Sequence, residues 1–250
     1  MIMDPPAKDQ EEWIFLEAFR HVSHEFPSGR IIKSESPDFI LRHSRRYAIG
    51  IEITRLTGSY ATQDYFQPGP HHEEVKGILE EACSLFEMKY GISLYVQAGF
   101  RNDAYHRSGS AQNTATLLAE WVGERIEEIN GGTEYSLIEQ QPVDLPFLDH
   151  IRVLYIPGLR FSHWSVHDEP ETGGWIPGLI EHTLQRKTHK LRLYRKRRLN
   201  QYWLIMVTST TEGLPKFNLQ DHLDQRQWFT GFQQVFLFEL FPPKITPVFS

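Results

Sequence analysis

The sequence predicts an α/β fold, because segments with strand character and segments with helical periodicity mix along the whole chain. Residues 202–208 read YWLIMVT, an apolar run of strand length that is typical of a central, buried strand. Residues 9–26 space their apolar side chains for one face of a helix. With 16 Phe, 10 Tyr and 6 Trp in 250 residues, the chain can fill a sizeable core. No repeat or low-complexity linker divides it, so we expect one α/β domain over residues 1–250 with an insertion.

The first half of the chain begins with the helix at 9–26, which Pro27 and Gly29 end. Three short runs with strand character follow, and the short linker 44–46 between the last two predicts a hairpin. A loop, a helix stopped by Gly91, a strand and a helix closed by Gly131-Gly132 come next. The expected strands are 30–33, 38–43, 47–54 and 92–98, the loop is 58–70, and the two later helices are 73–90 and 113–129.

The second half contains a long basic helix at 176–199, with Pro177 tolerated in its first turn. Before this helix we expect a strand at 151–156 and an irregular segment at 161–175. After it come the apolar strand 202–208, a last strand at 235–240, and a tail that starts at Pro242-Pro243.

Composition narrows the function classes. A single cysteine, Cys83, excludes an internal disulfide and a Cys-rich zinc site. No apolar run is long enough to span a membrane and the first residues lack a signal-peptide pattern, so we expect a cytoplasmic protein with no membrane partner. The net charge of −6 argues against non-specific coating of nucleic acid. Residues 186–198, however, contain eight Lys or Arg and no acid, which predicts one local basic surface.

Two carboxylates stand out on the expected hairpin. In the strand 47–54, Glu52 shares its face with Ala48 and Gly50, whose small size predicts open space beside the carboxylate. Asp38 opens the preceding strand, so the hairpin would bring it beside Glu52. Neighbouring carboxylates repel each other, and Mg²⁺ held by one or two carboxylates plus waters is a common remedy in phosphodiester-cleaving sites. The alternative is that Asp38 caps a turn and Glu52 ends an exposed strand.

SPDFIL at 36–41 followed by IGIEIT at 49–54 resembles the PD-(D/E)xK nuclease superfamily. The resemblance implies a restriction-endonuclease-like core, a central mixed sheet flanked by helices, with a large insertion. The core would be about 9–56 and 176–240, and the insertion about 57–175. It also implies a Mg²⁺- or Mn²⁺-dependent nuclease (a hydrolase acting on DNA or RNA), with Asp38 and Glu52 as metal ligands.

The chain departs from this family where the motif lysine should stand, because that position is Thr54. Lys187 lies inside the apolar stripe of the basic helix, and Lys190 lies on the same side. Either Lys187 reaches past the apolar surface to water, or it points at the carboxylate pair and supplies the missing charge. If 73–90 were the core helix instead, Lys76 or Lys89 would be the candidate.

Further residues complete the expected site. Members of the superfamily often add an acid from the first helix, and Glu11 lies on the inward stripe of 9–26. The basic face would hold a phosphate backbone, although cations at a helix C-terminus are also favourable on their own. The candidate nucleic-acid-binding residues are Arg192, Arg195, Lys196, Arg197 and Arg198.

The histidines show neither an HExxH pattern nor a cysteine partner, and we do not expect them to bind metal. Two other functions stay open beside the nuclease. One is a nuclease-like fold without catalysis that serves as a binding or assembly module. The other is an unrelated α/β protein in which the acidic pair is coincidental.

Overall fold

The computed structural model describes residues 7–56, 70–101, 110–129, 135–166, 176–208 and 231–249. The chain divides into two compact units. Unit 1 comprises Met1–Glu17 and Asp64–Asp168, and unit 2 comprises Ala18–Gln63 and Glu169–Ser250. The first helix, α1 (Ala7–Val22), begins in unit 1 and ends in unit 2. Each unit is an α/β structure with a mixed sheet and helices, as the sequence predicts for the fold class.

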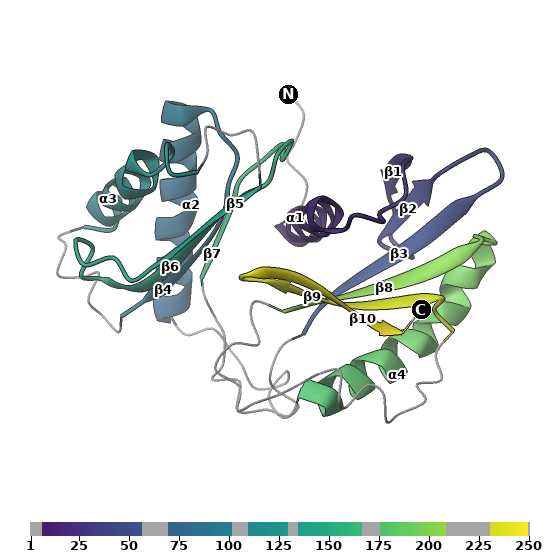
Figure 1. The fold of residues 1–250 in the computed structure, drawn as a ribbon. Coiled ribbons are helices and arrows are strands. Elements are labelled where there is room, and N and C mark those ends of the chain that lie inside the picture. The colour runs from purple at the N-terminus through teal and green to yellow at the C-terminus, as the bar shows by residue number, and fades with distance from the viewer. Residues whose placement is uncertain are drawn as a thin grey trace. The chain divides into compact units, whose positions relative to one another are not determined.

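Unit 2 is built on a six-stranded sheet in the order β1-β2-β3-β8-β9-β10 (Figure 1). The pairs β3–β8 and β8–β9 are parallel, and the other three pairs are antiparallel. The strands are β1 (Arg30–Lys33), β2 (Phe39–Arg42), β3 (Ala48–Arg55), β8 (Gln201–Thr208), β9 (Gln234–Leu240) and β10 (Pro243–Phe249).

Helix α4 (Ile176–Tyr194) runs along one face of this sheet (Figure 1). Its apolar stripe packs on alternate residues of the central strands, because side chains along a strand point to opposite faces in turn. The other face meets the end of α1, where Phe19 contacts Phe236 and Phe238 edge-on or tilted. The α4 face buries Ile180, Leu184, Leu191, Tyr194, Tyr202, Leu204, Met206, Val235 and Leu237.

Unit 1 contains a four-stranded sheet in the order β5-β6-β4-β7. Its strands are β5 (Ser136–Gln140), β6 (Leu148–Tyr155), β4 (Tyr95–Phe100) and β7 (His163–Val166). Helices α2 (Pro70–Tyr90) and α3 (Ala111–Glu124) pack against each other (Figure 1). They share one apolar core with alternate residues of the sheet, such as Val96, Ile151 and Val153.

Most expected elements are confirmed to within a few residues, and the differences lie at ends and edges. The expected irregular segment 161–175 contains strand β7, and the expected tail after Pro242 is strand β10, so both of those expectations are wrong. Strand β5 was also not anticipated. Helix α4 ends at Tyr194 rather than 199, and a 3-10 turn, η3 (Arg195–Arg197), follows it.

The expected insertion, at about 57–175, covers nearly the same residues as the Asp64–Asp168 part of unit 1. That this segment is an insertion into a nuclease-like core stays a prediction. Residues 58–69 of the expected loop, Gly131-Gly132 and residues 167–175 lie outside the described residues. Among the helices that the structure describes, none has the length and apolar character needed to cross a membrane.

Candidate functional site

The β2–β3 hairpin places Asp38 beside Glu52. Phe39 pairs with Ile51 in the antiparallel ladder, so continuing the register by one residue sets Asp38 opposite Glu52. Both are buried, with 9% and 4% of their surfaces exposed. Asp38 Oδ2 accepts a hydrogen bond of 2.7 Å from the backbone N of Ile53. The two strands therefore present both carboxylates in one place, and Asp38 also closes the end of the ladder.

Helix α4 brings a lysine to Glu52. In the parallel β3–β8 ladder Glu52 pairs with Leu204, whose side chain lies in the core beneath α4. Lys187 Nζ donates a hydrogen bond of 2.7 Å to Glu52 Oε1. Only 10% of the Lys187 side chain and 5% of the Glu52 side chain are exposed. The lysine inside the apolar stripe thus ends at a carboxylate and not in water.

Tyr194 is a site residue that sequence reasoning did not single out. It lies seven residues after Lys187, two turns further along the same face of α4, and is 2% exposed. Burial raises the pKa of its phenol well above the ordinary range, and the nearby charges of Glu52 and Asp38 raise it further. The phenol therefore stays protonated beside the two carboxylates. Its place on the stripe that holds Lys187 was the available signal.

One oxygen of Glu52 is left open by these contacts. Oε2 is buried and has no hydrogen-bond partner among the described residues. A buried carboxylate oxygen without a partner is costly, and a bound cation would satisfy it. The described residues contain no group of three or more His, Cys, Asp or Glu that could hold a metal ion. Two carboxylates match the one or two that Mg²⁺ commonly takes from a protein, because this ion keeps several waters.

The space expected beside Glu52 at Gly50 is filled, which corrects the sequence-based expectation. A Cβ at this position would lie 2.7 Å from Pro37 Cγ and 2.9 Å from Leu199 Cδ1. Glycine is needed there because Pro37 and Leu199 cover the strand. Gly50 therefore leaves no room for an ion on its own side of Glu52.

The structure does not bring every candidate to this place. Lys190 is exposed, one turn from the buried Lys187. Glu11 is half-buried in the part of α1 that belongs to unit 1, and its role as a metal ligand stays a prediction. The alternative lysines, Lys76 and Lys89, lie in α2 of unit 1, where Lys76 pairs with Glu80 and Lys89 lies over the ring of Tyr90.

The candidate nucleic-acid-binding residues are all exposed at the C-terminal end of α4 and in the turn that follows it. Arg198 ends η3 in the left-handed conformation, with φ of 51°. Gly231 lies against this end of the helix, where a Cβ would meet Leu191 and approach Arg195 Nη2 at 3.0 Å. The basic surface therefore belongs to unit 2, as do Asp38, Glu52 and Lys187.

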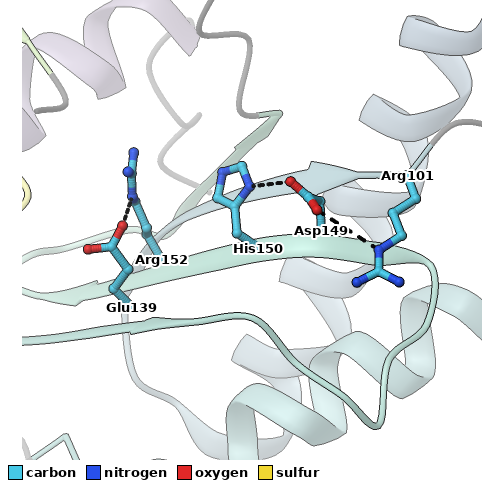
Figure 2. Close-up of polar contacts among 5 residues, drawn as sticks. All are labelled: Arg101, Glu139, Asp149, His150 and Arg152. Atoms are coloured by element: carbon cyan, nitrogen blue, oxygen red, sulfur yellow. Dashed lines mark hydrogen bonds and ion pairs between the residues drawn. The ribbon is translucent and has the colours of Figure 1, made fainter. Parts of the chain in front are cut away.

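Unit 1 has polar contacts of its own on the sheet face opposite its helices. Glu139 and Arg152 are partners in the β5–β6 ladder, and Arg152 Nε donates to Glu139 Oε1 at 2.6 Å (Figure 2). Asp149 lies between His150 and Arg101, at 3.5 and 4.0 Å. The contact between Glu139 and Arg152 follows from cross-strand pairing, and the contact between Asp149 and His150 joins neighbours in the chain. Among these described residues, no group of three or more His, Cys, Asp or Glu could hold a metal ion.

Cys83 has no nucleophilic character in this structure. Burial is the main reason that the pKa of its thiol rises to about 12, and the nearby charge of Glu87 adds to the effect. The thiolate, which is the reactive form, is therefore scarce at neutral pH.

Comparisons of the chain with protein-family models, with curated proteins and with solved structures find no match. The geometry of unit 2 therefore carries the functional argument.

Proposed function

We propose that this chain is a metal-dependent phosphodiesterase that cleaves nucleic acid, with its site on the β2–β3 hairpin and α4 of unit 2. The observation that carries the proposal is the buried Glu52, which binds Lys187 through Oε1 and keeps Oε2 open beside Asp38. Helix α4 leads from this site into β8, which pairs in parallel with the motif strand β3. That arrangement supports the resemblance to a restriction-endonuclease-like core.

Asp38 and Glu52 would hold Mg²⁺ or Mn²⁺, which when bound polarises a phosphoryl oxygen and acidifies its bound water. Lys187 places a positive charge beside Glu52. This charge would stabilise the negative charge that develops on the phosphate during cleavage. The buried, protonated phenol of Tyr194 lies beside both carboxylates. The exposed cations from Arg192 to Arg198 bind the phosphate backbone and supply sequence-independent affinity.

A second function, a nuclease-like binding or assembly module without cleavage, is favoured by the contacts of Asp38. Its Oδ2 already serves the backbone of Ile53, as a purely structural aspartate would. Thr54 in place of the motif lysine points the same way. Both functions place nucleic acid or another polyanion at the basic surface, so cleavage and metal binding distinguish them.

The decisive test compares Asp38→Asn and Glu52→Gln with the wild-type chain on DNA and RNA substrates in Mn²⁺. Asn can still accept the Ile53 hydrogen bond, and Gln can still accept the Lys187 hydrogen bond, so both variants should keep the fold. We expect each variant to lose about 100-fold or more in cleavage rate, which is the typical effect of removing one group that stabilises a transition state. Calorimetry should show that Mn²⁺ binding is lost as well.

Glu239→Gln is the matched control, because Glu239 is a buried carboxylate of the same sheet, 5% exposed, outside the proposed site. It should cleave like the wild type. Cleavage that survives in both Asp38→Asn and Glu52→Gln would rule out this mechanism. A wild-type chain that neither binds Mn²⁺ nor cleaves would support the binding module.

A further inference from the structure

The two oxygens of Glu52 have unequal surroundings. Oε1 accepts a hydrogen bond from Lys187 Nζ at 2.7 Å, whereas Oε2 is buried without a hydrogen-bond partner in the described part of the chain. An ionised carboxylate accepts at about four lone-pair positions. Lys187 thus occupies one side of the very group that a metal ion would need.

Lys187 is also well placed to act as a cation in its own right. Its side chain is 10% exposed, and its stem is held by the apolar stripe of α4 between Leu184 and Leu191. A buried ammonium is stable only with a partner, so Lys187 holds Glu52 strongly while no other partner is at hand. Asp38 lies opposite Glu52 in the β2–β3 register, so the two carboxylates share one region.

We propose that Lys187 competes with a divalent cation for Glu52, so that the lysine sets the affinity of the site for the metal. This inference rests on the proposed function, because it assumes that Asp38 and Glu52 bind a hard divalent cation. The ammonium and the ion repel each other at close range, and binding of the ion weakens the Lys187–Glu52 contact. The long, unbranched lysine stem allows Nζ to withdraw from Oε1 without movement of the helix.

The test measures binding and needs no substrate. Manganese chloride alone is titrated into the full chain by calorimetry, for the wild type, Lys187→Met and Lys187→Arg. Met has a similar length without the charge, so we expect Lys187→Met to bind Mn²⁺ at least about tenfold more tightly than the wild type. Arg keeps the charge, so the Kd of Lys187→Arg should stay within about threefold of the wild-type value.

The outcomes separate this inference from the proposed function. If the wild type binds Mn²⁺ and Lys187→Met binds it equally or more weakly, competition is overturned and the metal site stands. If neither chain binds Mn²⁺, both the competition and the metal site fail. Because removal of the lysine leaves a buried carboxylate, folding is checked by circular dichroism, and Lys187→Gln provides a second neutral variant. A larger rise in melting temperature with Mn²⁺ for either neutral variant than for the wild type supports the competition.

Discussion

The positive charge beside Glu52 comes from a helix and not from the strand that carries the carboxylate. Thr54 lies two residues after Glu52 on the same face of β3, pairs with Met206 of β8 and is 9% exposed. A lysine at 54 would stand about 7 Å along the strand from Glu52, within reach of its carboxylate. Lys187 already supplies one positive charge to Glu52, so a lysine at 54 would be a second one.

If the lysine can act from either position, moving it from 187 to 54 should preserve part of its effect. Lys187→Met should destabilise the fold by about 3–5 kcal/mol, because it leaves Glu52 buried without its partner. It should also reduce cleavage at least about 100-fold. The double variant Thr54→Lys, Lys187→Met restores an ammonium beside Glu52, and it should recover at least about tenfold in cleavage and part of the stability. Urea unfolding and a cleavage assay measure the two effects.

The single variant Thr54→Lys is the control for the swap, because it adds a second buried ammonium near Lys187 and the two positive charges repel each other. It should lose stability relative to the wild type. If the double variant is no better than Lys187→Met in either measurement, the position of the lysine matters and its charge alone does not.

Side-chain alternation and the short hairpin linker were enough to predict that Asp38 and Glu52 are neighbours, because both signals are local. The surroundings of the pair could not be predicted in the same way. Gly50 is covered by Pro37 and by Leu199, which follows it by about 150 residues, and no periodicity in β3 indicates that contact. In the sequence, Tyr194 is an ordinary residue of the apolar stripe of α4. Its place beside Glu52 becomes visible only from the way α4 packs on the sheet.

Helix α4 combines a buried half and a basic end, and its length sets the distance between them. Lys187 lies eight residues before Arg195, which corresponds to about 12 Å along the helix axis at 1.5 Å per residue. A strand of B-DNA carries one phosphate per 3.4 Å of axis, so the basic turn lies about three to four phosphates from the cation site. In the proposed function, the same element would therefore position both the lysine at Glu52 and the phosphate contacts.

This placement predicts a change in salt dependence. Lys196→Ser with Arg197→Ser replaces two exposed cations that are not in the core, so the fold should be kept. The slope of log K against log salt for duplex DNA should fall in magnitude by about 0.9 for each phosphate contact removed. Fluorescence anisotropy from low to moderate salt measures the slope. Lys76→Ser in α2 removes an exposed lysine of unit 1 and should leave it unchanged, and an unchanged slope in the double variant would remove the basic turn from the interface.

All three strands that the sequence patterns missed lie at sheet edges. β10 contains Pro243 and Pro247, which normally argue against a strand, yet an edge strand tolerates proline because one row of its N–H groups has no partner to meet. β5 and β7 are the edges of the other sheet and are five and four residues long. Short strands show little alternation, yet β1 and β2, each of four residues, were predicted, as were the long central strands β3 and β8.

The division into two units also left no mark in the composition. The described boundary in α1 falls within a continuous helix, between Glu17 and Ala18, where no glycine or proline marks a linker. Each unit has its own apolar core, one beneath α2 and α3 and the other beneath α4. The carboxylates, Lys187, Tyr194 and the basic turn all belong to unit 2. The proposed site is therefore complete within a single unit, apart from the prediction for Glu11.

Separate cores predict that damage to unit 1 leaves the metal site in place. Leu118 lies in α3, is 0% exposed and packs in the core of unit 1. Leu118→Ala should cost about 2–5 kcal/mol in the free energy of unfolding, which urea titration followed by tryptophan fluorescence measures. Its Kd for Mn²⁺ at 25 °C should stay within about twofold of the wild type, because no ligand moves.

Leu204→Ala, in the core beneath α4 and next to Glu52 in the ladder, should weaken both stability and Mn²⁺ binding. A folded Leu118→Ala chain that no longer binds Mn²⁺ would mean that unit 1 contributes directly to the site, with Glu11 as the first residue to substitute.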